Sequence, residues 1–77
     1  MTGRIEPDYN ALALALARRY PLAAVAERVG CSATSVSLLA RGVVRTPHLN
    51  YRKAWLKVYR DEFDADPPTR SGKPYNG

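Results

Sequence analysis

The stretch that decides the fold is Leu22-Ala-Ala-Val-Ala-Glu-Arg-Val-Gly-Cys-Ser-Ala-Thr-Ser-Val-Ser-Leu-Leu-Ala-Arg-Gly42. Its first eight residues carry apolar side chains at positions i, i+3, i+4 and i+7, which is the spacing of one buried helix face. Gly30 follows as a helix stop, because glycine adopts the left-handed conformation without a steric cost. Ser32 is a good N-cap, so we expect a second helix over residues 33–41, closed by Gly42.

The residues around this turn suit two helices that cross at roughly a right angle. The first helix needs a small residue where the second one crosses it, and Ala26 supplies it four residues before Gly30. Cys31 is expected to turn inward as a small hydrophobic side chain. The expected shared core comprises Val25, Val29, Val36 and Leu39. Two short helices joined by a glycine-containing turn are typical of the DNA-binding helix-turn-helix.

The rest of the chain predicts two more helices and a tail. Asp8 is a suitable N-cap for a helix with apolar side chains at helical spacing, and Pro21 interrupts that helix. Thr46-Pro47 is a cap-plus-proline start for a helix that runs to about Phe63. After Phe63 the apolar periodicity stops. We therefore expect an all-α fold of four or five helices, organised as a flexible N-terminus (1–7), a helix-turn-helix domain (8–63) and a disordered C-terminal tail (64–77).

Positive charge is concentrated in one block of the sequence. The 77 residues hold twelve Lys and Arg against seven Asp and Glu, a net charge of +5. Residues 32–60 contain six of the basic residues and no acid, whereas residues 61–77 contain four acids and two bases. An acid-free basic block beside an acidic strip suits a polyanionic partner such as nucleic acid.

Length and composition exclude several classes of protein. A chain of 77 residues has room for one small core, which excludes a two-domain enzyme, a dinucleotide-binding fold and a barrel. The single Cys forms no intrachain disulfide, and no apolar run reaches the roughly 18 residues of a membrane span. We therefore expect a cytoplasmic protein without a membrane partner.

The sequence also offers little for catalysis or metal binding. His48 and Cys31 alone cannot complete a four-ligand zinc site. No base accompanies Cys31 for nucleophilic catalysis. We expect no enzymatic activity, no metal, no cofactor and no small-molecule ligand.

The stretch from residue 22 to residue 42 resembles the helix-turn-helix of Cro and the phage repressors, the lambda-repressor-like family. The residues that carry the resemblance are Ala26, Gly30, Ser32, Val36 and the closing Leu39-Ala40-Arg41-Gly42. The resemblance is weaker over residues 8–63. It implies a homodimeric, sequence-specific regulator of transcription from a phage or prophage, which represses its own gene from a palindromic operator in double-stranded DNA. It also implies a location at the nucleoid of a bacterial host cell.

In this family the second helix of the motif lies in the major groove. Carried over position by position, the resemblance implies base contacts by Ala33, Thr34, Ser37 and Leu38. The flanking residues expected at phosphates are Ser32, Arg41 and Arg45. The centre of this helix has no Arg, Asn or Gln, which make the most discriminating base contacts, so its own sequence specificity is expected to be modest.

The fourth expected helix has a basic face and a wide apolar face. Lys53, Lys57 and Arg60 form one stripe that could lie along a phosphate backbone. The apolar arc spans about 160° at 100° per residue, more than the roughly 100° that a single core contact needs. We therefore expect a homodimer interface at Tyr51, Trp55 and Val58. The alternative is that the whole arc caps the small core of the monomer.

A function from another class stays open at this point. A helix-turn-helix adaptor, or a subunit of a phage DNA-packaging or recombination assembly, would bind DNA nonspecifically with the same basic block. In that case the apolar arc of the fourth helix would be the functional surface. A symmetric repeat upstream of the chain's own gene is expected only for the repressor.

Overall fold

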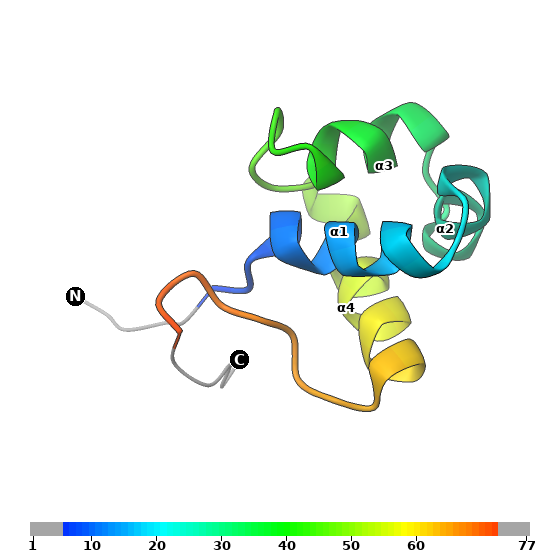
Figure 1. Ribbon diagram of the computed structural model, residues 1–77. Helices are drawn as coiled ribbons and strands as arrows, with labels where there is room; N and C mark the ends of the chain where they lie inside the picture. Colours follow the sequence, from blue (N-terminus) through cyan, green and yellow to red (C-terminus); the bar gives the residue numbers. More distant parts are fainter. Residues whose placement is uncertain (1–5, 73–77) are drawn as a thin grey trace.

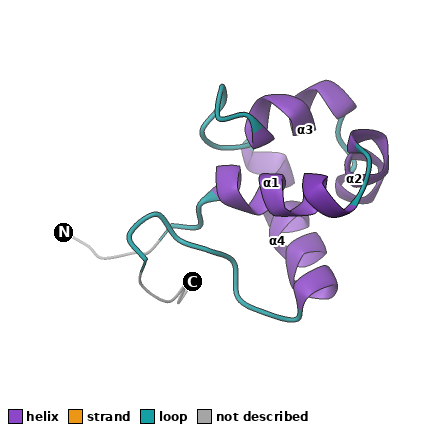
Figure 2. Cartoon of the chain, in the orientation of Figure 1, coloured by secondary structure: helices purple, strands orange, loops and turns teal. Residues whose placement is uncertain are grey.

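Four α-helices and no strand make up the part of the chain that the structure, a computed structural model, describes, residues 6–72 (Figure 1). The helices are α1 (Tyr9–Arg19), α2 (Leu22–Val29), α3 (Ala33–Ala40) and α4 (Leu49–Phe63). Both α3 and α4 pack against α1 and α2. Loops make the connections, with short ones between the first three helices and a longer one before α4 (Figure 2). The prediction of an all-α domain is confirmed in its four-helix form.

Two of the helices begin at the caps that the sequence predicts. Asp8 Oδ1 accepts a hydrogen bond from the Ala11 amide at 3.2 Å and starts α1. Ser32 Oγ accepts one from the Ser35 amide at 3.1 Å and starts α3. Each bond satisfies one of the backbone amides that has no partner inside the first turn of a helix.

The bounds of α3 and α4 differ slightly from the predicted ones. His48, rather than Thr46, is the N-cap of α4, and its Nδ1 accepts from the Asn50 amide at 3.3 Å. The Pro47 carbonyl accepts from Arg52 Nε at 3.2 Å, outside the helix ladder. The helix therefore begins two residues later than predicted, because the His48 imidazole after Pro47 acts as the cap in place of the Thr46 hydroxyl. At the other bound, α3 ends at Ala40 and Arg41 is its C-cap.

The core consists of one apolar face from each helix. The buried side chains are those of Tyr9, Leu12, Ala13, Leu16, Val25, Ala26, Val29, Val36, Leu39, Trp55 and Val58. The expected shared core of α2 and α3 is therefore confirmed, although Leu22 at the start of α2 is 38% exposed. Among residues 6–72, no single helix is long and apolar enough to cross a membrane. Taken together, α2 and α3 have the length and apolar composition of a span, but the pair is bent by 107°.

The position of Trp55 and Val58 corrects the predicted dimer interface. Trp55 is 1% exposed and Val58 is 7% exposed, so both belong to the core of the monomer. The reason is that α4 has two neighbours, α1 and α2, and a helix packed on two neighbours buries a wider arc than a helix packed on one. Of the three predicted interface residues, Tyr51 alone keeps an exposed side chain, at 37%.

The segment after α4 is predicted to be a disordered tail, but its residues 64–72 have a defined course with contacts to the N-terminal segment. Over residues 64–72 the chain returns to the N-terminal segment, where the Pro68 carbonyl accepts from the Asp8 amide at 2.7 Å. Pro7 and Thr69 form an isolated antiparallel bridge, and Pro67 is buried. The two prolines favour an extended backbone, which leaves the Pro68 carbonyl free to pair with a distant segment. Residues 1–5 and 73–77 of the predicted termini lie outside the described residues.

A polar cluster joins the end of α4 to α1 and α2. Glu62 Oε2 pairs with Arg19 Nη1 at 2.9 Å, and Glu62 Oε1 accepts from the Tyr20 hydroxyl at 2.8 Å and from Arg28 Nη1 at 3.3 Å. The hydrogen bond from Tyr20, followed by that from Arg19, lowers the pKa of Glu62. The same hydrogen bond raises the pKa of Tyr20. The ionised carboxylate of Glu62 therefore stabilises the packing of three helices.

The Glu62 cluster predicts a loss of stability in acid. A carboxylate whose pKa is lowered by folding contributes stability above its ordinary pKa of 4.5, and this contribution disappears as the pH falls through the lowered value. Glu62→Gln keeps an acceptor for the Tyr20 hydroxyl but has no charge to lose. We expect Glu62→Gln to be less stable than the wild type at pH 7 and the difference to shrink toward pH 3, as measured by urea unfolding. Parallel stability curves for the two proteins would contradict this role for Glu62.

Candidate nucleic-acid interface

α2 and α3 are joined by a tight turn at residues 30–32 and are bent by 107° relative to each other. This angle lies within the range of about 90–120° found for helix-turn-helix units. Gly30 adopts the left-handed conformation, with φ of 92°, and its amide donates to the Ala26 carbonyl at 2.7 Å. Ala26 is buried and Cys31 packs against the core, as the sequence predicts.

The left-handed turn makes Gly30→Ala a direct test of the turn geometry. An added Cβ at Gly30 would meet nothing within 4 Å, so the cost of this substitution comes from the backbone conformation alone. We expect Gly30→Ala to lower the free energy of unfolding by about 1–2 kcal/mol. Gly30→Asn is expected to lose less, because asparagine tolerates the left-handed region. Urea unfolding of the three proteins checks this order, and equal losses for both variants would contradict a purely conformational cost.

The outward face of α3 consists of the side chains opposite its core contacts. Val36 and Leu39 are buried, whereas Thr34 and Arg41 are exposed and Leu38 is half-buried between them. At 100° per residue, Thr34, Leu38 and Arg41 form one row along the side of α3 that faces away from α1. This row is the candidate reading face of the domain.

Two of the four residues predicted at the bases lie outside this row. Ser37 is half-buried on one flank, and Ala33 packs against the core. Ser35, which is not among the predicted residues, is exposed on the other flank of α3. Its hydroxyl lies 3.0 Å from Ser32 Oγ, so the two serines engage each other at the start of the helix. Ser32, predicted at a phosphate, therefore already uses its hydroxyl oxygen as the cap.

The structure separates the predicted phosphate-contacting residues into two groups. Arg41 and Arg45 are exposed and directly follow α3. Lys53, Lys57 and Arg60 lie on α4, which begins behind α1 on the side of α3 and ends on the opposite side (Figure 1). Lys57 pairs with Asp61 at 2.9 Å and Arg60 with Asp66 at 3.5 Å. Of the basic residues in this set, Arg41 and Arg45 are thus the close neighbours of α3 in the chain, and part of the charge on α4 is compensated locally.

The stretch of chain that contains the reading face carries charge of one sign. No Asp or Glu occurs between Glu27 and Asp61, so α3 and the segment that follows it carry only neutral and basic side chains. The acids near the end of α4 include Asp61, Asp64 and Asp66. This end is the part of α4 that lies away from α3 (Figure 1). The resulting field favours an anionic partner at α3.

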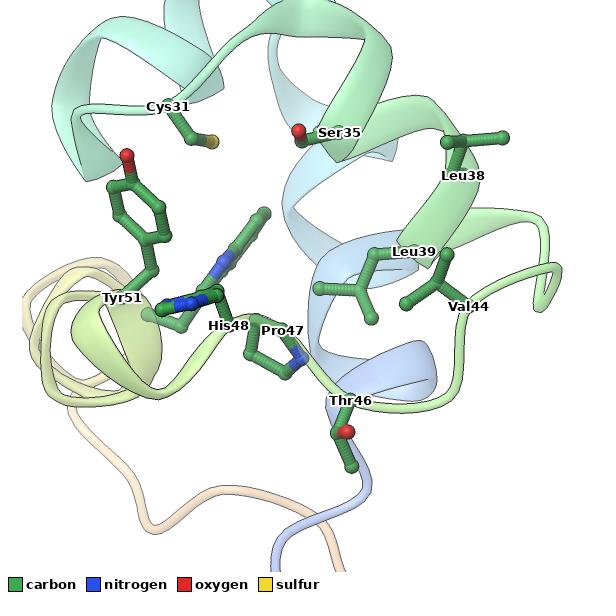
Figure 3. Close-up of a pocket in the computed structure, with 10 residues that line it drawn as sticks. Cys31, Ser35, Leu38, Leu39, Val44, Thr46, Pro47, His48 and Tyr51 are labelled. Atoms are coloured by element: carbon green, nitrogen blue, oxygen red, sulfur yellow. The ribbon is translucent and has the colours of Figure 1, made fainter.

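A cleft of about 130 Å³ lies between the α2–α3 turn, α3 and the start of α4 (Figure 3). The buried side chains of Trp55 and Leu39 line it, and Cys31 and Tyr51 lie near one end. The other lining residues are Ser35, Leu38, Val44, Thr46, Pro47 and His48. Burial raises the pKa of the Cys31 thiol, so the thiol stays protonated at neutral pH and is a poor nucleophile. Within residues 6–72 no cluster of three His, Cys, Asp or Glu side chains is placed to hold a metal ion.

Comparisons with known proteins add no relative to this description. No family model, no curated protein and no solved structure matches the chain. The interpretation of the site therefore depends on the residues of this chain and their geometry.

Proposed function

We propose that this chain is a sequence-specific double-stranded-DNA-binding regulator of transcription that inserts α3 into the major groove. The observation that carries the proposal is the pair α2 and α3, bent by 107° around Gly30, with an outward row of side chains on α3 in an acid-free part of the chain. A B-DNA major groove about 12 Å wide admits one α-helix. The row lies opposite the buried side chains of α3, with Thr34 and Arg41 exposed and Leu38 half-buried, so α3 can enter a groove without unfolding the domain.

The side chains of the row suit different parts of a duplex. Leu38 offers an apolar surface to a thymine methyl group, and the Thr34 hydroxyl both donates and accepts hydrogen bonds. Arg41 and Arg45 supply guanidinium groups for phosphates at the end of α3. From Thr34 to Arg41 the helix rises about 10 Å, which corresponds to about three base pairs at 3.4 Å each. One copy therefore reads a short sequence, and two copies on a palindromic operator would supply the affinity and specificity of a repressor.

A homodimer in this proposal requires an exposed surface other than the buried Trp55. Apolar side chains are exposed along the segment between α3 and α4 and at the start of α4, where Val43 is 63% and Leu49 is 70% exposed. Val44 and Tyr51 are also exposed and line the cleft. These four residues replace Trp55 and Val58 as candidates for the contact between two copies. Because the fraction of homodimer rises with protein concentration, such a regulator would bind its operator more as it accumulates, which suits repression of its own gene.

Selection of bound duplexes from random DNA at about 150 mM salt tests the proposal, because affinity is interpretable only at a stated salt concentration. We expect enrichment of two short half-sites related by a two-fold axis, with centres about 10 base pairs apart. Binding without any enriched sequence would overturn sequence-specific regulation. That result would favour the nonspecific adaptor or packaging subunit instead.

A further inference from the structure

The side chain of Asn10, in the first turn of α1, bridges the two sides of the turn that ends α3. Its Nδ2 donates to the Leu39 carbonyl at 2.7 Å and to the Val44 carbonyl at 2.7 Å. An amide nitrogen has two protons, so both donors are used. Leu39 lies in the last turn of α3 and Val44 lies beyond the helix. Asn10 therefore ties the end of α3 to the loop that follows it.

The oxygen of the same amide connects this tie to the C-terminal segment. Asn10 Oδ1 accepts from Arg70 Nη2. Arg70 also donates to the Arg45 carbonyl at 3.4 Å and lies 3.6 Å from Asp8 Oδ1. Since Pro68 accepts from the Asp8 amide, the returning segment holds Arg70 in place. Three segments that are distant in sequence thus meet at one amide group.

The loop fixed by this network carries two of the candidate DNA contacts. Arg41 and Arg45 are exposed at its two ends, and residues 41–46 contain no buried side chain. Within the loop, the amides of Val43 and Val44 donate to the Leu38 carbonyl at 3.0 and 3.3 Å. A loop without a buried side chain depends strongly on such hydrogen bonds for its conformation.

We infer that Asn10 and Arg70 are positioning residues that hold Arg41 and Arg45 in the orientation required for DNA binding. This inference rests on the proposed function. A preorganised loop reduces the entropy lost when the two arginines engage phosphates, so affinity rises without any new contact to DNA. The C-terminal segment then contributes to DNA binding through Arg70, although the fold places it against the N-terminal segment.

The test compares Asn10→Ala, Arg70→Ala and the double variant with the wild type. Arg18→Ala serves as the control, because it removes one exposed positive charge from α1 without touching the network. The first readout is hydrogen exchange at the Val43 and Val44 amides, where we expect at least a tenfold acceleration in Asn10→Ala and a smaller one in Arg70→Ala. The second readout is the salt dependence of DNA affinity, measured well below the unfolding temperature.

Asn10→Ala is expected to bind DNA about tenfold more weakly than the wild type. The slope of log affinity against log salt concentration is expected to become smaller in magnitude by about one or two, which corresponds to the loss of one or two phosphate contacts. The double variant is expected to lose less affinity than the sum of the two single losses, because Asn10 and Arg70 contact each other. Global destabilisation would not change the salt slope of the folded protein. Arg70→Lys is expected to restore part of the affinity lost in Arg70→Ala, because lysine also donates to Asn10 and carries the charge.

Three outcomes would overturn the inference. The first is an Asn10→Ala protein that is folded and keeps wild-type exchange and salt slope. The second outcome applies if Asn10→Ala does not fold: it is an Arg70→Ala protein that keeps the hydrogen exchange and the DNA affinity of the wild type. The third is accelerated exchange with unchanged DNA affinity, which would leave only a structural role. A wild type that binds no DNA would remove the proposed function, and the exchange measurements would then decide separately whether the network holds the loop.

Discussion

A Trp55→Ala variant is expected to lose about 3–5 kcal/mol of unfolding free energy. Trp55 is the largest fully buried side chain and is 1% exposed, in the helix that packs against both α1 and α2. Its truncation would also enlarge the neighbouring cleft of about 130 Å³, so the loss of packing adds to the loss of apolar burial. A single core of this size rarely supplies more than about 3–5 kcal/mol in total. The variant should therefore be largely unfolded at room temperature.

Lys53→Ala is the matched control for this prediction. Lys53 lies on the same helix but is exposed and is not among the candidate contacts between two copies, so its truncation is expected to change stability by no more than about 0.5 kcal/mol. Urea unfolding followed by circular dichroism measures both variants, and sedimentation reports their oligomeric state. A Trp55→Ala protein that stays fully folded and changes only its oligomeric state would return Trp55 to a dimer interface.

Trp55 illustrates which part of the fold a single sequence predicts, the positions of the helices, and which part it does not, the partner that each apolar face packs against. Helix positions could be predicted, because caps, proline breaks and apolar spacing act within a few residues of each other. The apolar arc of α4 is too wide for one contact, but a single sequence does not say whether the second contact is another helix of the same chain or a second copy. The packing of α4 on both α1 and α2 answers this for Trp55 and Val58.

The candidate site divides in the same way between local and distant determinants. The turn at Gly30 and the cap at Ser32 were predictable, since each depends on residues inside one stretch of the chain. The hydrogen bonds that join Asn10 to the loop after α3 and to Arg70 are not predictable from the sequence, because the partners of Asn10 lie 29 to 60 residues away along the chain. A polar residue in the first turn of a helix predicts only an exposed position. The one available sign is that Asn10 stands between apolar residues at the start of α1.

A Thr34→Glu variant is expected to lose DNA affinity by about 100-fold or more while its folding stability stays constant or increases. Thr34 is exposed in the first turn of α3, at the N-terminal end of the row that would face the bases and phosphates. In the proposed complex a carboxylate there would lie close to the phosphate charges of the groove, and like charges brought together at an interface cost several kcal/mol. In the free protein the same carboxylate interacts favourably with the helix dipole, by about 0.3–1 kcal/mol. The first turn of α3 carries no acid in the wild type.

The opposite signs of these two effects make Thr34→Glu the sharpest test of how α3 meets DNA. Damage to the fold would lower both quantities together, whereas a carboxylate on the reading face lowers affinity alone. Thr34→Gln has nearly the same shape without the charge and should remain within a few-fold of the wild type. Arg18→Ala changes the net charge by the same amount on α1, so it measures the nonspecific part of the loss. If Thr34→Glu bound duplex DNA as tightly as Arg18→Ala does, the N-terminal half of α3 would lie outside the interface, and DNA binding would have to be assigned to the basic stripe of α4.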